Sequence, residues 1–220
     1  MISVTRDKTL LGKLVPELTG LENDAERQAF LSRHPRLVRP RVVNELADLV
    51  IKKIPQDPKQ ALRLAEVLVL IARKIGDPEG VALALRQNGN ALYACGESGA
   101  AVEHHQRAYE TYVSRGNWLQ AAVTLNCSIQ PLILLGEYSR AFDASEQARE
   151  IFTRMGEGKR LAFLENNVGN IFHRQDRFEE ALLHYERAYQ ALADYQEWEH
   201  DAVALSNMAM CLIGLNDFSR

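Results

Sequence analysis

The sequence predicts an all-α fold: a right-handed α-solenoid of helix pairs behind an N-terminal helical cap. Alanine and leucine are abundant in its 220 residues, whereas there are only 13 glycines and 7 prolines, and this balance favours helices. Alanine also recurs with a period of about 40 residues, and self-similarity at a fixed period of roughly 20–50 residues is typical of stacked helical repeats. The recurrence forms two columns, Ala61, Ala101, Ala141, Ala181 and Ala82, Ala122, Ala162, Ala202.

The period divides the chain into a non-repeating segment, 1–41, and a repeat array, 42–220. We expect units at 42–81, 82–121, 122–161 and 162–201, and a partial unit at 202–220. The partial unit stops one residue before the expected packing alanine of its second helix. Because an array normally ends with a complete, polar capping element, we expect this chain to be a fragment of a longer array.

Each unit is predicted to contain two helices, and residues 117–156 show the pattern most clearly. Asn117 is a helix-capping residue, and Trp118 follows as the first helical residue. Gly136 is expected to break this first helix. A second helix is then predicted from about Ser139 to Met155, where apolar residues recur on one face, and the next glycine should end it.

Small residues recur where the two helices of a unit are expected to cross. Gly89, Gly169 and Ala209 occupy one position of the first helix. Small side chains at a crossing let two helices approach to about 8–10 Å. Two departures stand out, because Ile129 replaces the packing glycine of its unit and Asp176 replaces a turn glycine.

The segment 1–41 is interpreted as a cap that covers the first apolar helix face, with a short helix at 24–33. It holds 8 Lys+Arg and 5 Asp+Glu, a net charge of +3, whereas residues 42–220 hold 18 and 24, a net charge of −6. Arg33, Arg36, Arg39 and Arg41 lie close together, but no groove-reading motif accompanies them. We therefore expect no nucleic-acid partner.

The repeat resembles the tetratricopeptide repeat (TPR), in a long form of about 40 residues. The resemblance covers about residues 42–220 and follows the spacing Gly89…Leu92…Gly96…Ala101…Ala108. It is strongest in the third full unit, at Gly169…Phe172…Phe178…Ala181…Tyr185…Ala188. It implies that the first helix of each unit lines a concave groove that binds a peptide or a partner protein.

Positions five and nine of each first helix are expected to project into this groove, and they are mostly amides. An amide side chain both donates and accepts hydrogen bonds, so a row of amides can pair with the backbone of an extended peptide. Long-repeat TPR scaffolds use such asparagines, and the resemblance implies the same use here; a solvated polar face without a role is the alternative. The predicted groove residues are Arg86, Asn90, Asn126, Gln130, Asn166, Asn170, His173, Arg174 and Asn207.

The sequence carries no motif for catalysis or for a cofactor. It lacks G-x-x-x-x-G-K-[ST], G-x-G-x-x-G, G-x-S-x-G and H-E-x-x-H, so we expect no enzyme, no cofactor and no metal site. The three cysteines, Cys95, Cys127 and Cys211, show no Cys-x-x-Cys spacing and are interpreted as small buried packing residues. With no apolar run of about 18 residues and no signal peptide, we expect a cytoplasmic protein without a membrane partner.

Three phrases, FLSRHPRL, SIQPLILLGEYSRA and NNVGNIFHRQDRFEEAL, also resemble the N-terminal TPR regions of bacterial CHAT-domain proteins. In those proteins a caspase-like peptidase domain follows the repeats, so the resemblance implies a regulatory arm. A C-terminal domain of the same chain is then a candidate partner, and the open C-terminal end is a candidate for self-association. The alternative is the sensor arm of a bacterial transcription regulator or signalling kinase, which binds a small ligand or a peptide.

Overall fold

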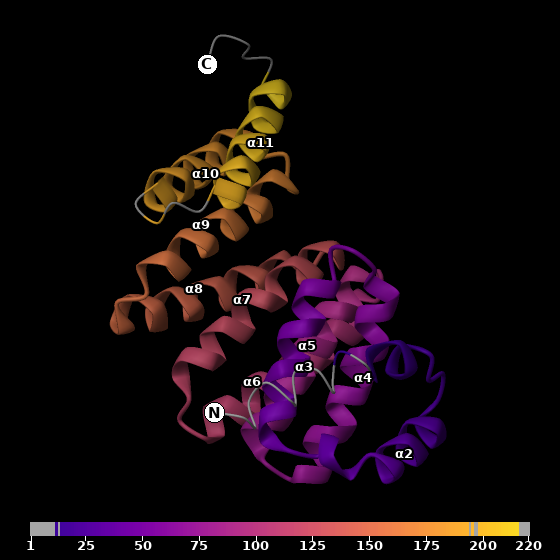
Figure 1. Cartoon of the computed structure of the whole chain (residues 1–220). Coiled ribbons are helices and arrows are strands. Elements are labelled where there is room, and N and C mark those ends of the chain that lie inside the picture. Colours follow the sequence, from indigo (N-terminus) through magenta and orange to yellow (C-terminus); the bar gives the residue numbers. More distant parts are fainter. Residues whose placement is uncertain (1–11, 13, 194, 196–197, 216–220) are drawn as a thin grey trace. The chain divides into compact units, whose positions relative to one another are not determined.

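The computed structural model describes residues 12, 14–193, 195 and 198–215 (Figure 1). The described residues form helices joined by short turns, with no strand among them, which confirms the predicted all-α class. The chain divides into two compact units, residues 1–115 (unit 1) and 116–220 (unit 2).

In unit 1 the long helices pack against their neighbours in chain order. α4 packs against α3 and α5, and α5 packs against α6. The bounds are α2 Asp24–Arg33, a 3₁₀ turn η1 Pro35–Leu37, α3 Pro40–Lys53, α4 Pro58–Ile75, α5 Pro78–Ala94 and α6 Ser98–Ser114.

Unit 2 repeats the same arrangement, and Figure 1 shows α9, α10 and α11 as neighbours in it. The first helices α7, α9 and α11 begin one period apart, as predicted. Their first residues lie before the expected boundaries at 121/122, 161/162 and 201/202, because a period sets the length of a repeat and not its phase. The bounds are α7 Trp118–Leu134, α8 Tyr138–Met155, α9 Gly158–His173, α10 Phe178–Ala193 and α11 Trp198–Gly214.

The helix ends follow the predicted signals. Asn117 caps α7 by accepting a hydrogen bond from the backbone N–H of Gln120 at 3.3 Å. Gly156 ends α8 in the left-handed conformation, with φ of 70°. The turn glycine of the next unit is replaced by Asp176, which nevertheless adopts φ of 57°. Aspartate tolerates this region better than most residues, so the departure leaves the turn intact.

A ring on the second helix lies over each packing glycine. A Cβ atom on Gly89 would lie 2.6 Å from the ring of His105, and one on Gly169 would lie 2.5 Å from the ring of Tyr185. Both contacts are too close for any side chain larger than hydrogen. The prediction that small residues permit these helix crossings is therefore confirmed for the two glycines.

The remaining departure, Ile129, has a matching change on the second helix. The residue equivalent to His105 and Tyr185 in its repeat is Ser145, and both Ile129 and Ser145 are fully buried. A large residue on the first helix thus accompanies a small one on the second, the reverse of the glycine–ring pairs. The combined side-chain volume of the two positions is preserved, as close packing requires, but the large and the small residue have exchanged helices.

The segment before α3 is fastened to α4 by polar contacts. The guanidinium of the buried residue Arg27 forms ion pairs with Asp24 and Glu66. Arg63 donates to the backbone oxygen of Thr19 at 2.8 Å. Burial raises the pKa of Glu66, against the opposing charge of Arg27. These contacts hold α2 and the residues before it against α4. The capping role of segment 1–41 stays a prediction.

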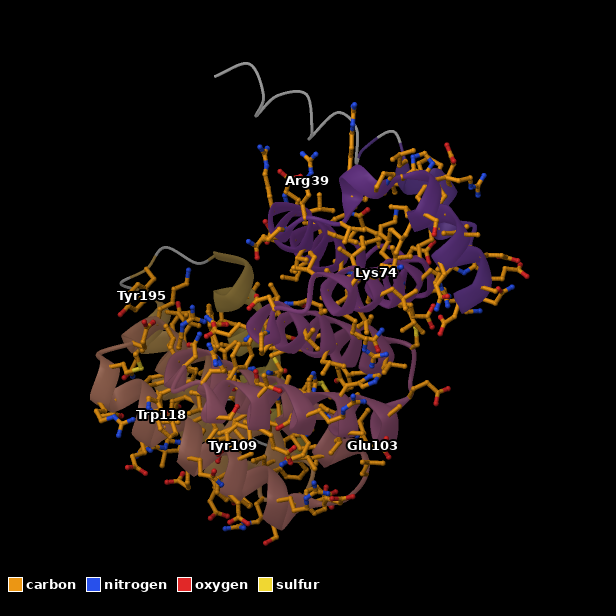
Figure 2. All side chains as sticks on the ribbon, turned by 90° about the horizontal axis from the view of Figure 1, so that it is seen from below. Arg39, Lys74, Glu103, Tyr109, Trp118 and Tyr195 are labelled. Carbon is orange, nitrogen blue, oxygen red and sulfur yellow. The ribbon has the colours of Figure 1, made fainter. Side chains whose placement is uncertain are left out.

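The expectation for the cysteines is partly wrong. Cys211 is fully buried, but Cys95 and Cys127 are only half-buried, and Cys95 lies at the cap that ends α5. Trp118, labelled in Figure 2, begins α7 as predicted, yet 45% of its surface is exposed. In the described part of the chain, no helix combines the length and apolarity needed to cross a membrane.

Candidate functional site

Six amide side chains join the first helices of unit 2, and we call them the amide row. Asn167 on α9 donates to Oδ1 of Asn126 on α7 at 2.8 Å, and its own Oδ1 accepts from Gln130 at 3.0 Å. One repeat later, Asn207 on α11 donates to Oδ1 of Asn166 at 3.1 Å and lies 3.5 Å from Oδ1 of Asn170. The row consists of Asn126, Gln130, Asn166, Asn167, Asn170 and Asn207.

The bonds of the amide row repeat with the helices. In each step one asparagine bridges positions five and nine of the preceding first helix. Both steps span 41 residues, from Asn126 to Asn167 and from Asn166 to Asn207. The carbonyl oxygens of Asn126 and Asn166 are used in these bonds, which leaves their N–H groups as donors. All six residues are half-buried, so each member of the row keeps some contact with solvent.

Asn167 is the member that the sequence analysis missed. It lies at position six, beside the predicted position-five residue, and a search confined to positions five and nine passes over it. The available signal was its register with Asn207, which lies one full period later and was predicted only as a neighbour of the row. The paired residues lie one residue more than a period apart. Such a pairing can be recognised only when the positions of both helices in the structure are known.

In unit 1 the predicted groove residues differ from the expectation. Arg86 is buried, with 7% of its surface exposed, and its guanidinium lies over the ring of Tyr112. Asn90 accepts a hydrogen bond from Nε2 of His105 at 3.0 Å and donates to Gln87 at 3.1 Å. Their side chains therefore take part in packing within unit 1, because two rings of α6 lie against them.

The end of α9 carries the last two predicted residues. His173 is half-buried, with its ring 5.4 Å from the ring of Phe178. Arg174 is exposed, and its backbone oxygen accepts from the hydroxyl of Tyr138 at 3.4 Å. No side-chain hydrogen bond joins either residue to the amide row within the described residues, although the backbone N–H of Arg174 donates to the backbone oxygen of Asn170. The row therefore ends at Asn170 on this helix.

A pocket of about 300 Å³ lies in unit 1, between the second helices α4 and α6 and beside α5. Its walls combine apolar side chains with both acidic and basic groups. Asn88, with only 4% of its surface exposed, lines the pocket, and its amide has no hydrogen-bond partner among the described residues. Its lining residues are Asp24, Leu62, Glu66, Val69, Leu70, Arg73, Asn88, Leu92, Ala100 and His104.

Aromatic side chains lie at the position of unit 2 that is equivalent to this pocket. Phe172 stacks on the ring of His184 at 5.1 Å, and Phe142 packs edge-on against Phe172, also at 5.1 Å. Nδ1 of His184 donates to Glu165 at 2.7 Å, and Arg149 pairs with the same carboxylate. Burial opposes the ionisation of Glu165, but these two donors outweigh it and lower its pKa.

None of these groups forms a metal site. Across the described ranges, no cluster of three or more histidine, cysteine, aspartate or glutamate side chains could hold a metal ion. The absence of catalytic activity stays a prediction.

Comparison with known proteins agrees with the helix-pair architecture. Residues 120–194 match the model of the tetratricopeptide repeat family. The match covers α8, α9 and α10 and most of α7, so it includes Asn126, Gln130 and the three α9 members of the amide row. No curated protein matches the sequence of the chain.

Two solved structures show how far the TPR-like fold extends. BtubC (BKLC) from P. vanneervenii is 19% identical, with 94% of this chain and 85% of that chain covered, at a TM-score of 0.67. A Podosopora anserina structure of nearly identical TPR-like repeats, from a kinesin light chain candidate, is 14% identical. It covers 82% of this chain and 90% of that chain, at a TM-score of 0.62. At these identities the likeness shows the fold alone.

Proposed function

We propose that this chain is a binding module that holds an extended peptide or a partner segment along the amide row of unit 2, in a concave groove lined by α7, α9 and α11. The carrying observation is the repeated bridge in which Asn167 and Asn207 tie together the amides of successive first helices. The bridges orient Asn126 and Asn166, whose N–H groups remain as donors. Donors held in place before binding lose less conformational freedom when a ligand arrives.

The test compares two triple variants of the full chain. Asn126→Ala, Asn166→Ala and Asn170→Ala together remove three members of the row. Proteins captured from a lysate of the source cell by the wild type should be lost with this variant. The control carries Asp143→Ala, Glu150→Ala and Arg154→Ala on α8, all exposed, and should capture the wild-type set. Identical capture by all three proteins would overturn the proposal, provided that thermal unfolding shows each to be folded.

We also propose that this chain belongs to a larger protein. The resemblance of three phrases to CHAT-domain proteins supports a regulatory arm, with the peptidase domain of the same chain as its partner. A bacterial source and a cytoplasmic location belong to the same proposal. Reading the open reading frame beyond Arg220 tests it: a Cys/His peptidase domain would support it, and a helix-turn-helix or a kinase core would replace it.

Self-association is a separate part of the proposal. Several large apolar side chains on α11 are exposed, among them Leu205, Met210 and Ile213. A second copy that packs against this face would bury them. Light scattering at rising protein concentration should then show dimers. A strict monomer at high concentration would contradict self-association.

A second candidate function is a sensor arm that responds to a small ligand, and the pocket of unit 1 favours it. At about 300 Å³ the pocket lies at the small end of the range of known ligand sites, roughly 300–1,000 Å³. It is lined by four helices, and it contains a buried amide without a partner among the described residues. The two candidates use different units, so separate variants can test them.

A further inference from the structure

The pocket of unit 1 can be compared with an equivalent position in unit 2, because both units consist of the same repeat. His104 in the pocket corresponds to His184, two repeats later. The pocket residues Leu62 and Leu92 correspond to Phe142 and Phe172, the two rings of unit 2 that pack edge to face. The smaller aliphatic side chains of unit 1 leave open the space that the aromatic rings occupy in unit 2.

The polar partner of the histidine is also absent in unit 1. Nδ1 of His184 donates to Glu165, but the equivalent of Glu165 is Leu85. Nδ1 of His104 is buried and has no hydrogen-bond partner in the described part of the chain. A buried nitrogen without a partner loses its hydration and gains nothing in return. The pocket thus lacks both a flat apolar group beside the histidine and a carboxylate at its Nδ1.

Asn88 points to the same missing group. Its equivalent in unit 2 is Val168, an apolar residue in the same buried place. A polar group bound in the pocket can pair with this amide. Asn88 and His104 both line the pocket, so a ligand bound there can contact both side chains.

The charges of the pocket favour an anion at this end. The acidic residues Asp24 and Glu66 are both paired with Arg27, which reduces their repulsion of an anion. Arg73, near His104, has no carboxylate partner among the described residues. It lies seven residues after Glu66 on α4, or about 10 Å along the helix. A guanidinium pairs with carboxylates through two parallel hydrogen bonds.

We propose that the pocket of unit 1 binds a small organic carboxylate whose body is a flat apolar ring. The ring lies between Leu62 and Leu92, where unit 2 has Phe142 and Phe172. The carboxylate accepts from His104 and Asn88 and pairs with Arg73, as Glu165 does with His184 and Arg149. This inference names the ligand class of the sensor candidate, on which it rests, and is independent of the amide row.

The experiment uses 3-phenylpropionate as the probe and follows the imidazole signals of the full chain by NMR. The signal of His104, assigned with His104→Gln, should shift on titration to millimolar concentrations. The neutral amide of the same acid should bind at least about tenfold more weakly, because it lacks the charge that the donors require. Equal binding of acid and amide, or no shift with either, would overturn the proposal.

Two variants copy unit 2 into unit 1. Leu62→Phe with Leu92→Phe fills the pocket and should abolish binding. Asn88→Val keeps the side-chain volume and removes the amide, so it should weaken binding of the probe at least about tenfold. This variant tests the proposal if the variant with the filled pocket does not fold. Wild-type affinity in either folded variant would contradict the proposal.

Two further arms separate the outcomes. A short peptide that ends in phenylalanine carries the same carboxylate on a chain. If the peptide shifts the NMR signal of His104, the ligands of the pocket include the C-terminal ends of peptide chains. If only the free acid shifts this signal, the ligand is a free small molecule. Variants of the amide row should bind the probe as the wild type does, so failure of the groove proposal would leave this one standing.

Discussion

The hydroxyl of Tyr185 on α10 donates to Oδ1 of Asn170 on α9 at 2.7 Å, while the ring of the same tyrosine covers Gly169. The same relationship occurs in unit 1, where Nε2 of His105 donates to Oδ1 of Asn90 above the packing glycine. The packing glycine, the ring that covers it and the amide bonded to that ring's residue therefore form one structural element. Its parts depend on one another, and this dependence leads to the first three predictions.

Gly169→Ala should destabilise unit 2, although alanine is the better helix former by about 1 kcal/mol. The new methyl would meet the ring of Tyr185, so the ring must move, at a net cost on the order of 1–3 kcal/mol. The midpoint of urea unfolding measures the effect. Gly99→Ala is the matched control, because no atom lies within 4 Å of its new methyl and α6 should tolerate it. A Gly169→Ala protein as stable as the wild type would show that the contact is soft.

The exchange at Ile129 and Ser145 predicts that large and small residues can be transferred as a pair. Gly169→Ile alone should be severely destabilising, and Gly169→Ile combined with Tyr185→Ser should recover part of the loss. Residues in direct contact show coupling energies of roughly 0.5–3 kcal/mol in double-mutant cycles. The four proteins of the cycle, compared by urea unfolding, give this energy. Strictly additive effects would mean that Ile129 and Ser145 do not compensate each other.

His105 should make the stability of unit 1 depend on pH. Burial is the main cause that lowers its pKa to about 4, from 6.5 in the unfolded chain. Between these values the unfolded state binds the proton and the native state does not, so stability is complete above pH 6.5 and falls as the pH falls towards 4. The shift corresponds to about 3 kcal/mol.

His105→Tyr is the informative variant for this effect. It copies Tyr185 and keeps a ring over Gly89 with a hydroxyl near Asn90, but it does not titrate in this range. The difference between the unfolding midpoints of wild type and variant should change between pH 6.5 and 4. A constant difference would indicate that the native state protonates His105 without penalty.

Asn167→Ala should cost more stability than Asn126→Ala. The first removes both the donor and the acceptor that join α9 to α7, whereas the second removes one acceptor. A net hydrogen bond contributes about 0.5–1.5 kcal/mol, so a difference of this size is expected in unfolding experiments. Equal losses would mean that water replaces the second bond. Measured beside the capture experiment, these variants separate a structural role of the row from a binding role.

The residues of the chain alone were enough to predict the class of fold and most helix ends. The capping by Asn117 and the left-handed glycines act within a few neighbouring residues, so their effect can be read without the rest of the structure. The periodic recurrence of small residues identified the helix crossings for the same reason. Each crossing joins the two helices of one repeat, and both carry the pattern.

Tertiary structure decided what pairs with what between repeats. The bridge from Asn126 to Asn167 is displaced by one residue from the period, and the burial of Arg86 depends on the ring of Tyr112 on the next helix. The pocket beside His104 arises because several smaller residues coincide in space. Such features depend on the combined side-chain volumes and the unpaired hydrogen-bond donors of four helices. A linear pattern records each residue but not the space that these residues leave between them.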